Sequence, residues 1–286
     1  MLAHLAGPQL PGILQYTFTG HPAVIAFFVI SGFCIHHPYV GRPLPATAFL
    51  VARAIRILPP VLAAMAAAAW VGVKYYNFVD GYILWSVVCE LWYYALYPAF
   101  FALSRYVSWR SQWLASFVLA SALVLVLESN HIGSAHIYGP WLNWIVALPS
   151  WLLGCVLADG IRNPVGHVWA FRLATALTAS VLYWLTMNTA IGYNLTLNAF
   201  ALLVAAWMLA EIEAGGTTLF DWVGTWSFSI YLWHAIVNHV SPREPVIAIA
   251  LTLLGCYVAY RLIERPFHLI ARRVAWFLTP VQGNPS

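Results

Sequence analysis

Long apolar runs separated by short polar segments form the main pattern of this sequence. A helix that crosses a membrane needs about 20 apolar residues in succession, and runs of this length recur along the whole chain. Segments such as HHPYVGRPLP and SPREP separate them and mark loops. The pattern predicts nine membrane-spanning helices, at residues 21–37, 54–73, 82–103, 112–128, 141–158, 168–187, 195–212, 222–240 and 245–263.

The composition excludes an ordinary soluble protein. Hydrophobic residues make up 62% of the 286 residues and charged residues only 8%, whereas soluble domains contain about 25% charged residues. The mean hydropathy is +0.78, and no segment has the composition of a separate soluble domain. We therefore predict an all-α polytopic membrane protein, built as a single integral-membrane domain over residues 1–286 with a short cytoplasmic tail at 274–286.

The distribution of positive charge predicts how the chain is oriented. If the loop at 38–53 is cytoplasmic, all but Lys74 and Arg243 of the 13 Lys and Arg residues lie on or near the cytoplasmic side. Such an excess is typical of cytoplasmic loops in membrane proteins. It predicts a cytoplasmic C-terminus, and it explains the net charge of +4 without any role in binding nucleic acid.

Nine spans and a cytoplasmic C-terminus would place the residues before 21–37 outside. The chain begins MLAHLAGPQLPG, which has no charged region of the signal-peptide kind. We therefore predict that the chain carries the remnant of a tenth helix, the truncated first one, whose outer end is MLAHLA. The alternative is a protein with an external N-terminus that inserts without a leader.

Ionisable residues inside a membrane span are costly and are functional candidates by default. Glu90 lies in LWSVVCELWYYALYP and His234 in SIYLWHAIV. Ser86 and Tyr94 share the helix face of Glu90 at i−4 and i+4 and could satisfy its carboxylate. The structural alternatives are that Glu90 only bonds a hydroxyl or amide across the bundle and that His234 is a satisfied interior histidine.

Two arginines at i and i+3, Arg53 and Arg56, share one face at the predicted start of a span. Guanidinium groups suit phosphate, although both could instead anchor the helix among anionic headgroups. We expect the helix to start near Pro59 and Pro60. Arg261 and Glu264, about one turn apart, could simply pair.

Two histidines and the four cysteines give no indication of a catalytic or metal-binding role. We interpret His36 and His37 as residues of the membrane interface, set by topology. The cysteines lie in apolar runs without CxxC spacing or histidines at metal-ligand spacing, which predicts small buried side chains and no metal site; they are Cys34, Cys89, Cys155 and Cys256.

Five segments together resemble the integral-membrane acyltransferase family 3, which includes O-antigen and other glycan O-acyltransferases. FFVISGFCI is similar to the family's FFxxSGFxI segment, and RAIRILPP to its RxxRIxP element. LWSVVCELWYYALYP matches WSLxxEExFYLxYP at Trp85, Ser86, Glu90, Tyr94 and Pro98. VGTWSFSIYLWHAIV and RLIERPF resemble its last two elements. The resemblance implies ten helices and a histidine near the outer end of the first one, a place that His4 occupies.

The resemblance also implies an activity, the transfer of an acyl group, by family default acetyl, from cytoplasmic acyl-CoA to a hydroxyl of a glycan or lipid-linked sugar. No permanently bound cofactor is implied, and we expect a bacterial inner-membrane location among membrane lipids. On this hypothesis Arg53 and Arg56 bind the CoA phosphates. His4 acts as general base or carries the acyl group, and Glu90 orients a histidine or bonds the acceptor. Trp85, Ser86, Tyr94 and His234 support the site.

Other classes fit less well. A transporter or flippase of a lipid-linked or acylated molecule would show paired discontinuous helices in two repeated halves, and no such symmetry is visible in the sequence. An inactive, truncated relative is the second alternative, and it depends on the N-terminus. A hydrolase is disfavoured because no GxSxG or metal triad occurs.

Overall fold

The computed structural model describes residues 20–74, 76–78, 83–127, 138–160, 167–188, 193–215, 221–242 and 244–279. Within these ranges every regular element is helical, which confirms the predicted all-α class. The helices form two compact units, each described here by itself. We call them the α6 unit (residues 2–42 and 78–217) and the α3 unit (residues 43–77 and 218–286) after a helix that each contains.

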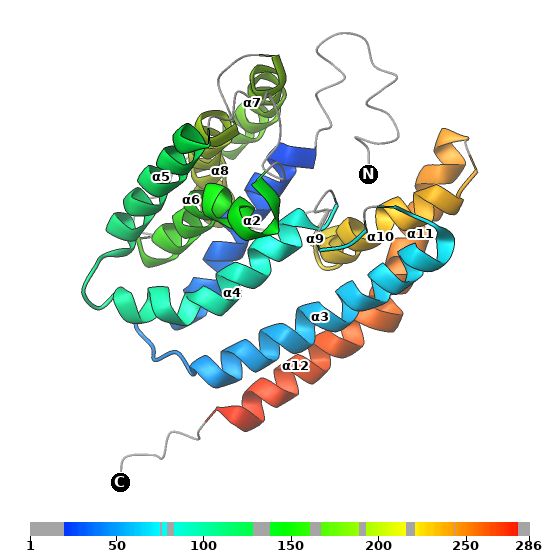
Figure 1. Ribbon diagram of the computed structural model, residues 1–286, viewed down its shortest axis with the longest axis horizontal. Coiled ribbons are helices and arrows are strands. Elements are labelled where there is room, and N and C mark those ends of the chain that lie inside the picture. The colour runs from blue at the N-terminus through cyan, green and yellow to red at the C-terminus, as the bar shows by residue number, and fades with distance from the viewer. Residues whose placement is uncertain are drawn as a thin grey trace. The chain divides into compact units, whose positions relative to one another are not determined.

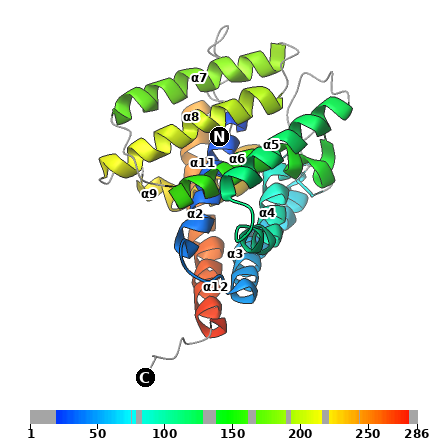
Figure 2. The same ribbon diagram turned by 90° about the vertical axis from the view of Figure 1, so that its left-hand side faces the viewer.

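The α6 unit surrounds one central helix (Figure 1). Helix α6 packs against α2, α4, α5 and α8, while α7 pairs with α8 (Figure 2). Between Gly139 and Ala158 helix α6 has no charged residue, so it can be buried on every side. The helices of the unit are α2 (Gly20–His36), the 3₁₀ turn η3 (His37–Tyr39), α4 (Trp85–Leu103), α5 (Trp109–Val126), α6 (Gly139–Gly160), α7 (Val168–Asn188) and α8 (Tyr193–Ala214).

The α3 unit is built around two helix pairs. Helix α3 lies beside α12, and α10 packs against α11 (Figures 1 and 2). The elements of the unit are α3 (Ala46–Val71), α9 (Asp221–Gly224), α10 (Ser227–Val240), α11 (Pro245–Ala259), the π-helical turn η5 (Tyr260–Glu264) and α12 (Arg265–Leu278). Helix α3 ends where Gly72, with φ 78°, adopts the left-handed conformation that favours glycine at helix ends.

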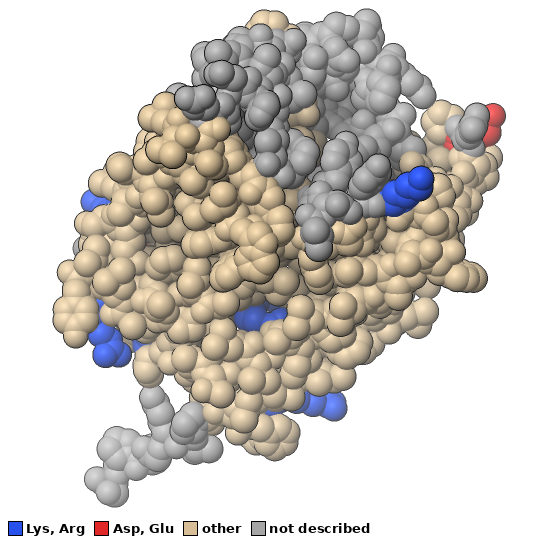
Figure 3. Space-filling view, in the orientation of Figure 1, with Lys and Arg blue, Asp and Glu red and all other residues tan. Residues whose placement is uncertain are grey.

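The chain is an integral membrane protein, and its surface agrees with that. Large apolar side chains such as Leu114, Val118, Leu173 and Leu177 are exposed on α5 and α7, where they suit contact with lipid. The face drawn in Figure 3 shows few charged residues among the described ones. Such a surface is normal only where hydrocarbon replaces water as the solvent.

Seven helical segments of the described residues are long and apolar enough to cross a membrane. Of the nine predicted spans, those at 195–212 and 222–240 are not among them, so the predicted number is not confirmed. The seven are Gly20–Tyr39, Ala46–Val71, Trp85–Leu103, Trp109–Val126, Gly139–Gly160, Val168–Leu185 and Pro245–Leu278. The remnant of a tenth helix at the N-terminus lies outside the described residues.

Helix α3 begins earlier than predicted. It starts at Ala46, so Pro59 and Pro60 lie inside it rather than at its start. Apolar residues on both sides of the prolines, among them Phe49 and Val61, are buried along one face, and this packing outweighs the proline penalty. Since proline has no N–H, the carbonyls of Ile55 and Arg56 lack the usual main-chain donor of a helix at this point.

The predicted span at 222–240 is interrupted. Helix α9 ends at Gly224 and α10 begins at Ser227. Around the break, the Thr225 hydroxyl donates to the Trp222 carbonyl over 2.7 Å and the Ser227 hydroxyl to the Gly224 carbonyl over 3.0 Å. Such local bonds compete with helical ones. The 14 residues of α10 rise only about 21 Å, less than the hydrocarbon core of about 30 Å.

The last predicted span, 245–263, is part of a longer helical run. Pro245–Leu278 continues through η5 for 34 residues, which corresponds to about 51 Å at the rise of an α-helix. Pro266 does not stop the helix because it lies at its first turn, where proline is tolerated. Helix α12 therefore extends well past the length that a membrane crossing requires.

Candidate active site

Glu90 is held by a chain of hydrogen bonds from two other helices. Its side chain on α4 is only 2% exposed, and it accepts a hydrogen bond from the hydroxyl of Ser31 on α2. The Trp151 indole N–H on α6 donates in turn to the Ser31 oxygen over 3.3 Å. The predicted bond from a hydroxyl across the bundle is therefore present, and its donor is Ser31, which the sequence did not single out.

Three further residues of the family-like segment lie on α4 with Glu90. Trp85, Ser86 and Tyr94 are all buried. The Trp85 ring meets Phe28 edge-on at 6.0 Å and stacks near His21 at 6.4 Å. Their supporting role remains a prediction, because the structure tests their position and burial but not their function.

His36 is buried among the helices at the far end of α2, and its predicted interfacial position stays a prediction. Its Nδ1 lies 3.0 Å from the Tyr97 hydroxyl, its ring lies 4.3 Å from that of Trp109, and its side chain is 2% exposed. The next residue, His37, is exposed and stacks on Phe33 at 5.1 Å. The sequence could not separate them, because neighbouring residues differ by about 100° around a helix.

Arg53 and Arg56 lie on the packing face of α3, in the α3 unit. Both are half-buried, and they fall on the helix face that carries the buried Ile57 and Pro60. The Arg53 guanidinium lies over the Phe49 ring at 5.4 Å. Because α3 starts at Ala46, both arginines are well inside the helix and not at its first turn as predicted.

Glu264 and Arg261 do not form the pair that their spacing suggested. The Glu264 carboxylate is buried and accepts a hydrogen bond from the Ser229 hydroxyl of α10 over 2.5 Å. Arg261 is exposed and donates to the Tyr257 hydroxyl over 3.2 Å. The π-helical turn that contains both residues shifts the usual helical register, so the two side chains point to different neighbours.

His234 is half-buried on α10 and bonded to its own helix. Its Nδ1 lies 2.9 Å from the Ile230 carbonyl and 2.8 Å from the Tyr231 carbonyl. Since a carbonyl only accepts, Nδ1 carries the hydrogen, and in the neutral ring Nε2 is then the acceptor. These bonds fix the orientation of the ring, and the supporting role of His234 stays a prediction.

The predicted site residues fall in different parts of the chain. Trp85, Ser86, Glu90 and Tyr94 belong to the α6 unit, whereas Arg53, Arg56 and His234 belong to the α3 unit. Ser31 and Trp151 join the first group. His4, the predicted base, lies outside the described residues.

The comparison with protein families decides the class. A family model described as an acyltransferase domain, of the acyltransferase 3 type, matches residues 1–262, which is most of the chain. The chain belongs to acyltransferase family 3. Comparison with curated proteins and with solved structures finds no significant match.

The acyltransferase motif SGF now has a structural explanation. Ser31 holds Glu90, and Gly32 allows α2 to approach α6 closely. A Cβ on Gly32 would collide with the Trp151 carbonyl, and one on Gly154 would collide with the Val29 carbonyl. The two glycines therefore bring the helix backbones together, which places Trp151 within reach of Ser31.

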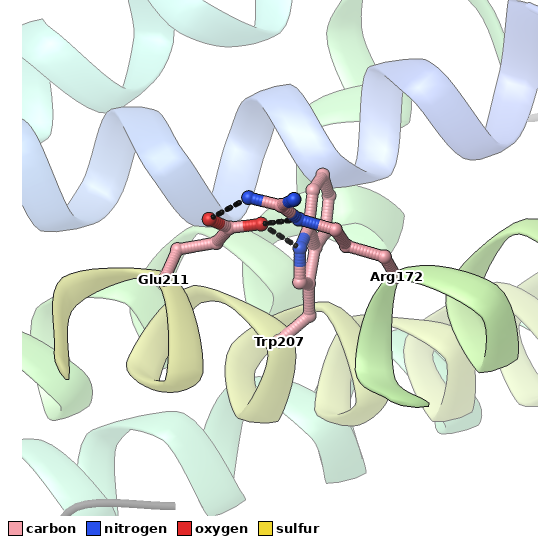
Figure 4. Close-up of polar contacts among 3 residues, drawn as sticks. All are labelled: Arg172, Trp207 and Glu211. Atoms are coloured by element: carbon pink, nitrogen blue, oxygen red, sulfur yellow. Dashed lines mark hydrogen bonds and ion pairs between the residues drawn. The ribbon is translucent and has the colours of Figure 1, made fainter. Parts of the chain in front are cut away.

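The acyltransferase has one ion pair that the sequence did not reveal. Arg172 of α7 donates to both carboxylate oxygens of Glu211 on α8, over 2.6 and 2.8 Å, and the Trp207 indole donates to the same carboxylate over 2.7 Å (Figure 4). The available signal was Glu211, an acid near the end of a largely apolar helix and four residues after Trp207. The pair ties α7 to α8.

Among the residues of the acyltransferase that the structure describes, no group of three or more His, Cys, Asp or Glu side chains could hold a metal ion. Cys89, Cys155 and Cys256 are free and buried as predicted. Cys34 is exposed, which corrects the expectation that it is buried. Its position at the outward side of α2, opposite the α6 contact, accounts for the difference.

Proposed function

We propose that this acyltransferase moves an acyl group, by family default acetyl, from cytoplasmic acyl-CoA to a hydroxyl of a glycan or lipid-linked sugar. The observation that carries the proposal is the pair Arg53 and Arg56, two half-buried guanidinium groups on the packing face of α3. The phosphates of CoA are suitable anions, because guanidinium binds phosphate through paired hydrogen bonds.

The chemistry requires a base for the acceptor. The acceptor oxygen attacks the thioester carbonyl carbon, the carbon–sulfur bond breaks, and CoA leaves as its thiolate, which takes up a proton. The proton of the acceptor hydroxyl passes to the base, for which His4 is our candidate. His4 could instead carry the acyl group briefly before the acceptor attacks.

Glu90 supports this step through hydrogen bonding. A carboxylate among apolar helices costs several kcal/mol, and the bonds from Ser31 and Trp151 hold the site in one arrangement. We assign Glu90 to orienting a histidine or bonding the acceptor, where the low dielectric strengthens each contact. Trp85, Ser86, Tyr94 and His234 support the site by packing and orientation.

The remaining proposals concern location. The excess of Lys and Arg in alternate loops supports a cytoplasmic C-terminus, and the family resemblance favours the bacterial inner membrane. If the end of α3 that carries Arg53 lies on the cytoplasmic side, a donor dissolved in the cytoplasm can reach it.

The test is an acyl-transfer assay on membranes, with labelled acetyl-CoA as donor. We expect Arg53→Gln together with Arg56→Gln to raise the apparent KM for acetyl-CoA about tenfold or more, because each charge-assisted bond contributes about 1.5–3 kcal/mol. Arg110→Gln is the matched control, since Arg110 is an exposed arginine of α5. An unchanged KM in the double variant would remove the phosphate role.

The same assay separates Glu90 from the donor site. Glu90→Gln and Ser31→Ala should lower kcat and leave the KM for acetyl-CoA unchanged, while Glu213→Gln, an exposed acid of α8, should change neither. Full turnover in Glu90→Gln would reduce Glu90 to a structural group. If the protein moved a lipid-linked saccharide across the membrane without consuming acetyl-CoA, the alternative function as a transporter or flippase would be favoured.

A further inference from the structure

The last helical run of the chain is longer than a membrane crossing and changes character along its length. Pro245–Leu278 comprises 34 residues, about 51 Å at the rise of an α-helix, whereas the hydrocarbon core is about 30 Å thick. Helix α11, its first part, contains no charged residue, and α12, its last part, contains three arginines and no Asp or Glu. Because charges are costly in hydrocarbon, α11 suits the membrane interior and α12 suits the membrane surface.

One side of α12 packs against α3, and the remaining side is exposed. The two helices lie side by side in both ribbon views (Figures 1 and 2), and Ala271 is the buried residue of α12. The three arginines are exposed, and so are large apolar side chains beside them, of which Trp276 is 72% and Phe277 75% exposed. We call this exposed side the α12 surface; it consists of Arg265, Leu269, Ile270, Arg272, Arg273, Trp276 and Phe277.

Basic and apolar side chains are interleaved on the α12 surface. One helix face carries, at i, i+4, i+7 and i+11, the residues Arg265, Leu269, Arg272 and Trp276. The adjacent face carries, at i, i+3 and i+7, the residues Ile270, Arg273 and Phe277. The rings of Trp276 and Phe277 meet edge-on with their centroids 5.0 Å apart. Whatever covers this surface therefore has to contact guanidinium groups and apolar side chains at the same time.

The charge of the α12 surface requires an anionic occupant. Among the residues that the structure describes, no acid forms an ion pair with any of the three arginines of α12. A second copy of the same surface would bring like charges together, which is unfavourable. An anionic phospholipid, in contrast, offers a phosphate to each guanidinium and acyl chains to the apolar side chains. Basic helices with exposed aromatic residues are typical of segments that lie in the membrane interface.

We propose that the α12 surface docks on anionic phospholipids at the membrane surface. Arg265, Arg272 and Arg273 bind the headgroup phosphates, since the arginine stem can lie along apolar surface while its charged end reaches the headgroups. The apolar members of the surface insert at the boundary between headgroups and acyl chains, where tryptophan is favoured. The docked lipid layer holds α12 and, through their packing, the adjoining part of α3.

The inference is independent of the proposed function and of the family assignment. The matched family segment ends at residue 262, and α12 begins at Arg265. The arginines that carry it belong to α12 alone, and the acyl donor has no part in it. A failure of the lipid experiment would therefore leave the proposed acyl transfer untouched.

Native mass spectrometry of the purified full chain tests the proposal. The protein in detergent is titrated with phosphatidylglycerol or with phosphatidylcholine, and the fraction of protein that carries each lipid gives its affinity. The test variants are Arg272→Gln/Arg273→Gln and Trp276→Ser/Phe277→Ser. The matched control is Arg105→Gln/Arg110→Gln, which removes the same charge from two exposed arginines of the α6 unit. Gel filtration and thermal unfolding verify that each variant is folded.

We expect the unaltered chain to bind phosphatidylglycerol more tightly than phosphatidylcholine. Arg272→Gln/Arg273→Gln should weaken phosphatidylglycerol binding about tenfold or more, because each basic side chain near an anionic lipid surface contributes to the attraction, and should leave phosphatidylcholine unchanged. Trp276→Ser/Phe277→Ser should weaken the binding of both lipids, and the control should behave like the unaltered chain. Unchanged phosphatidylglycerol binding in the arginine variant, or an equal loss in the control, would overturn the proposal.

Two further outcomes would assign the α12 surface to another occupant and so overturn the proposal. The first is a dimer in phosphatidylcholine nanodiscs that becomes a monomer in Trp276→Ser/Phe277→Ser, which would identify a second copy of the chain. The second is displacement of phosphatidylglycerol by inorganic phosphate to the extent seen in Arg272→Gln/Arg273→Gln, which would identify a site for free phosphate.

Discussion

Glu90 and Glu264 are the two buried carboxylates of the described residues, and both bond to a serine of another helix. Ser31 and Ser229 lie 59 and 35 residues away along the chain. In each case a serine hydroxyl donates one hydrogen bond to a carboxylate oxygen, whereas Glu211 is held by the guanidinium of Arg172. Each bond therefore joins two helical elements through residues that are distant in the sequence.

The Arg172–Glu211 pair, in contrast, should act on stability alone. Both side chains are about one third exposed, and exposed pairs contribute little. We expect Arg172→Lys, which loses the paired bonds and the stacking on Trp169 at 4.5 Å, to lower the apparent unfolding temperature by about 2 °C or less. Acyl transfer should be unchanged.

Thermal unfolding in detergent, followed by tryptophan fluorescence, measures this difference, with Arg110→Lys as an exposed control on α5. The effect should shrink in high salt, because screening weakens such pairs. A large loss of kcat in Arg172→Lys with unchanged stability would show that the pair belongs to the active site.

At the level of elements, the contact of α2 with α6 fixes the Glu90 network. Gly32 and Gly154 have no room for a Cβ because the opposing backbone is in the way. Backbone atoms cannot turn aside as a flexible side chain can, so an added methyl group must push the helices apart. The distance from Trp151 to Ser31, 3.3 Å, would then exceed that of a hydrogen bond.

We therefore expect Gly32→Ala to destabilise the protein by about 1–3 kcal/mol, the usual cost of overpacking, and to lower kcat more than it changes the KM for acetyl-CoA. Gly20→Ala is the matched control, because Gly20 lies on the same helix with open space around it. Thermal unfolding and the acyl-transfer assay provide the two measurements. Equal behaviour of the two variants would contradict the close approach of α2 and α6.

The sequence predicts the positions of helices better than it predicts which side chains bond to one another. The predicted spans at 21–37 and 141–158 agree closely with α2 and α6, because long apolar runs determine where helices form. The exceptions are local: packing carries α3 through Pro59, and hydroxyl groups interrupt the segment before Ser227.

Hydrogen-bond partners on different helices depend on how the helices pack against one another. A local sequence pattern does not contain that information. Ser86 and Tyr94, neighbours of Glu90 on the same helix, could be named from spacing, but Ser31 could not. The motif resemblance marked Ser31 and Gly32 as part of a pattern without giving their roles.

For the whole molecule, the sidedness of the chain determines which substrates reach which residues. The donor is cytoplasmic on the proposed function, so the loop at 38–53 and helix α12 have to lie on the cytoplasmic side together. The distribution of Lys and Arg predicts this arrangement. The run Pro245–Leu278, about 51 Å long, is long enough to cross the membrane and extend beyond its surface.

Fusions to alkaline phosphatase, which is active only outside the cytoplasm, test the arrangement in a bacterial host. We expect a fusion at Ser286 to be inactive and a fusion at Asn77, after Lys74 in the predicted outer loop, to be active. Fusions to green fluorescent protein at the same two positions should give the opposite result, which controls for expression. Active phosphatase at Ser286 would place the C-terminus outside the cytoplasm and would contradict the orientation on which a cytoplasmic donor site depends.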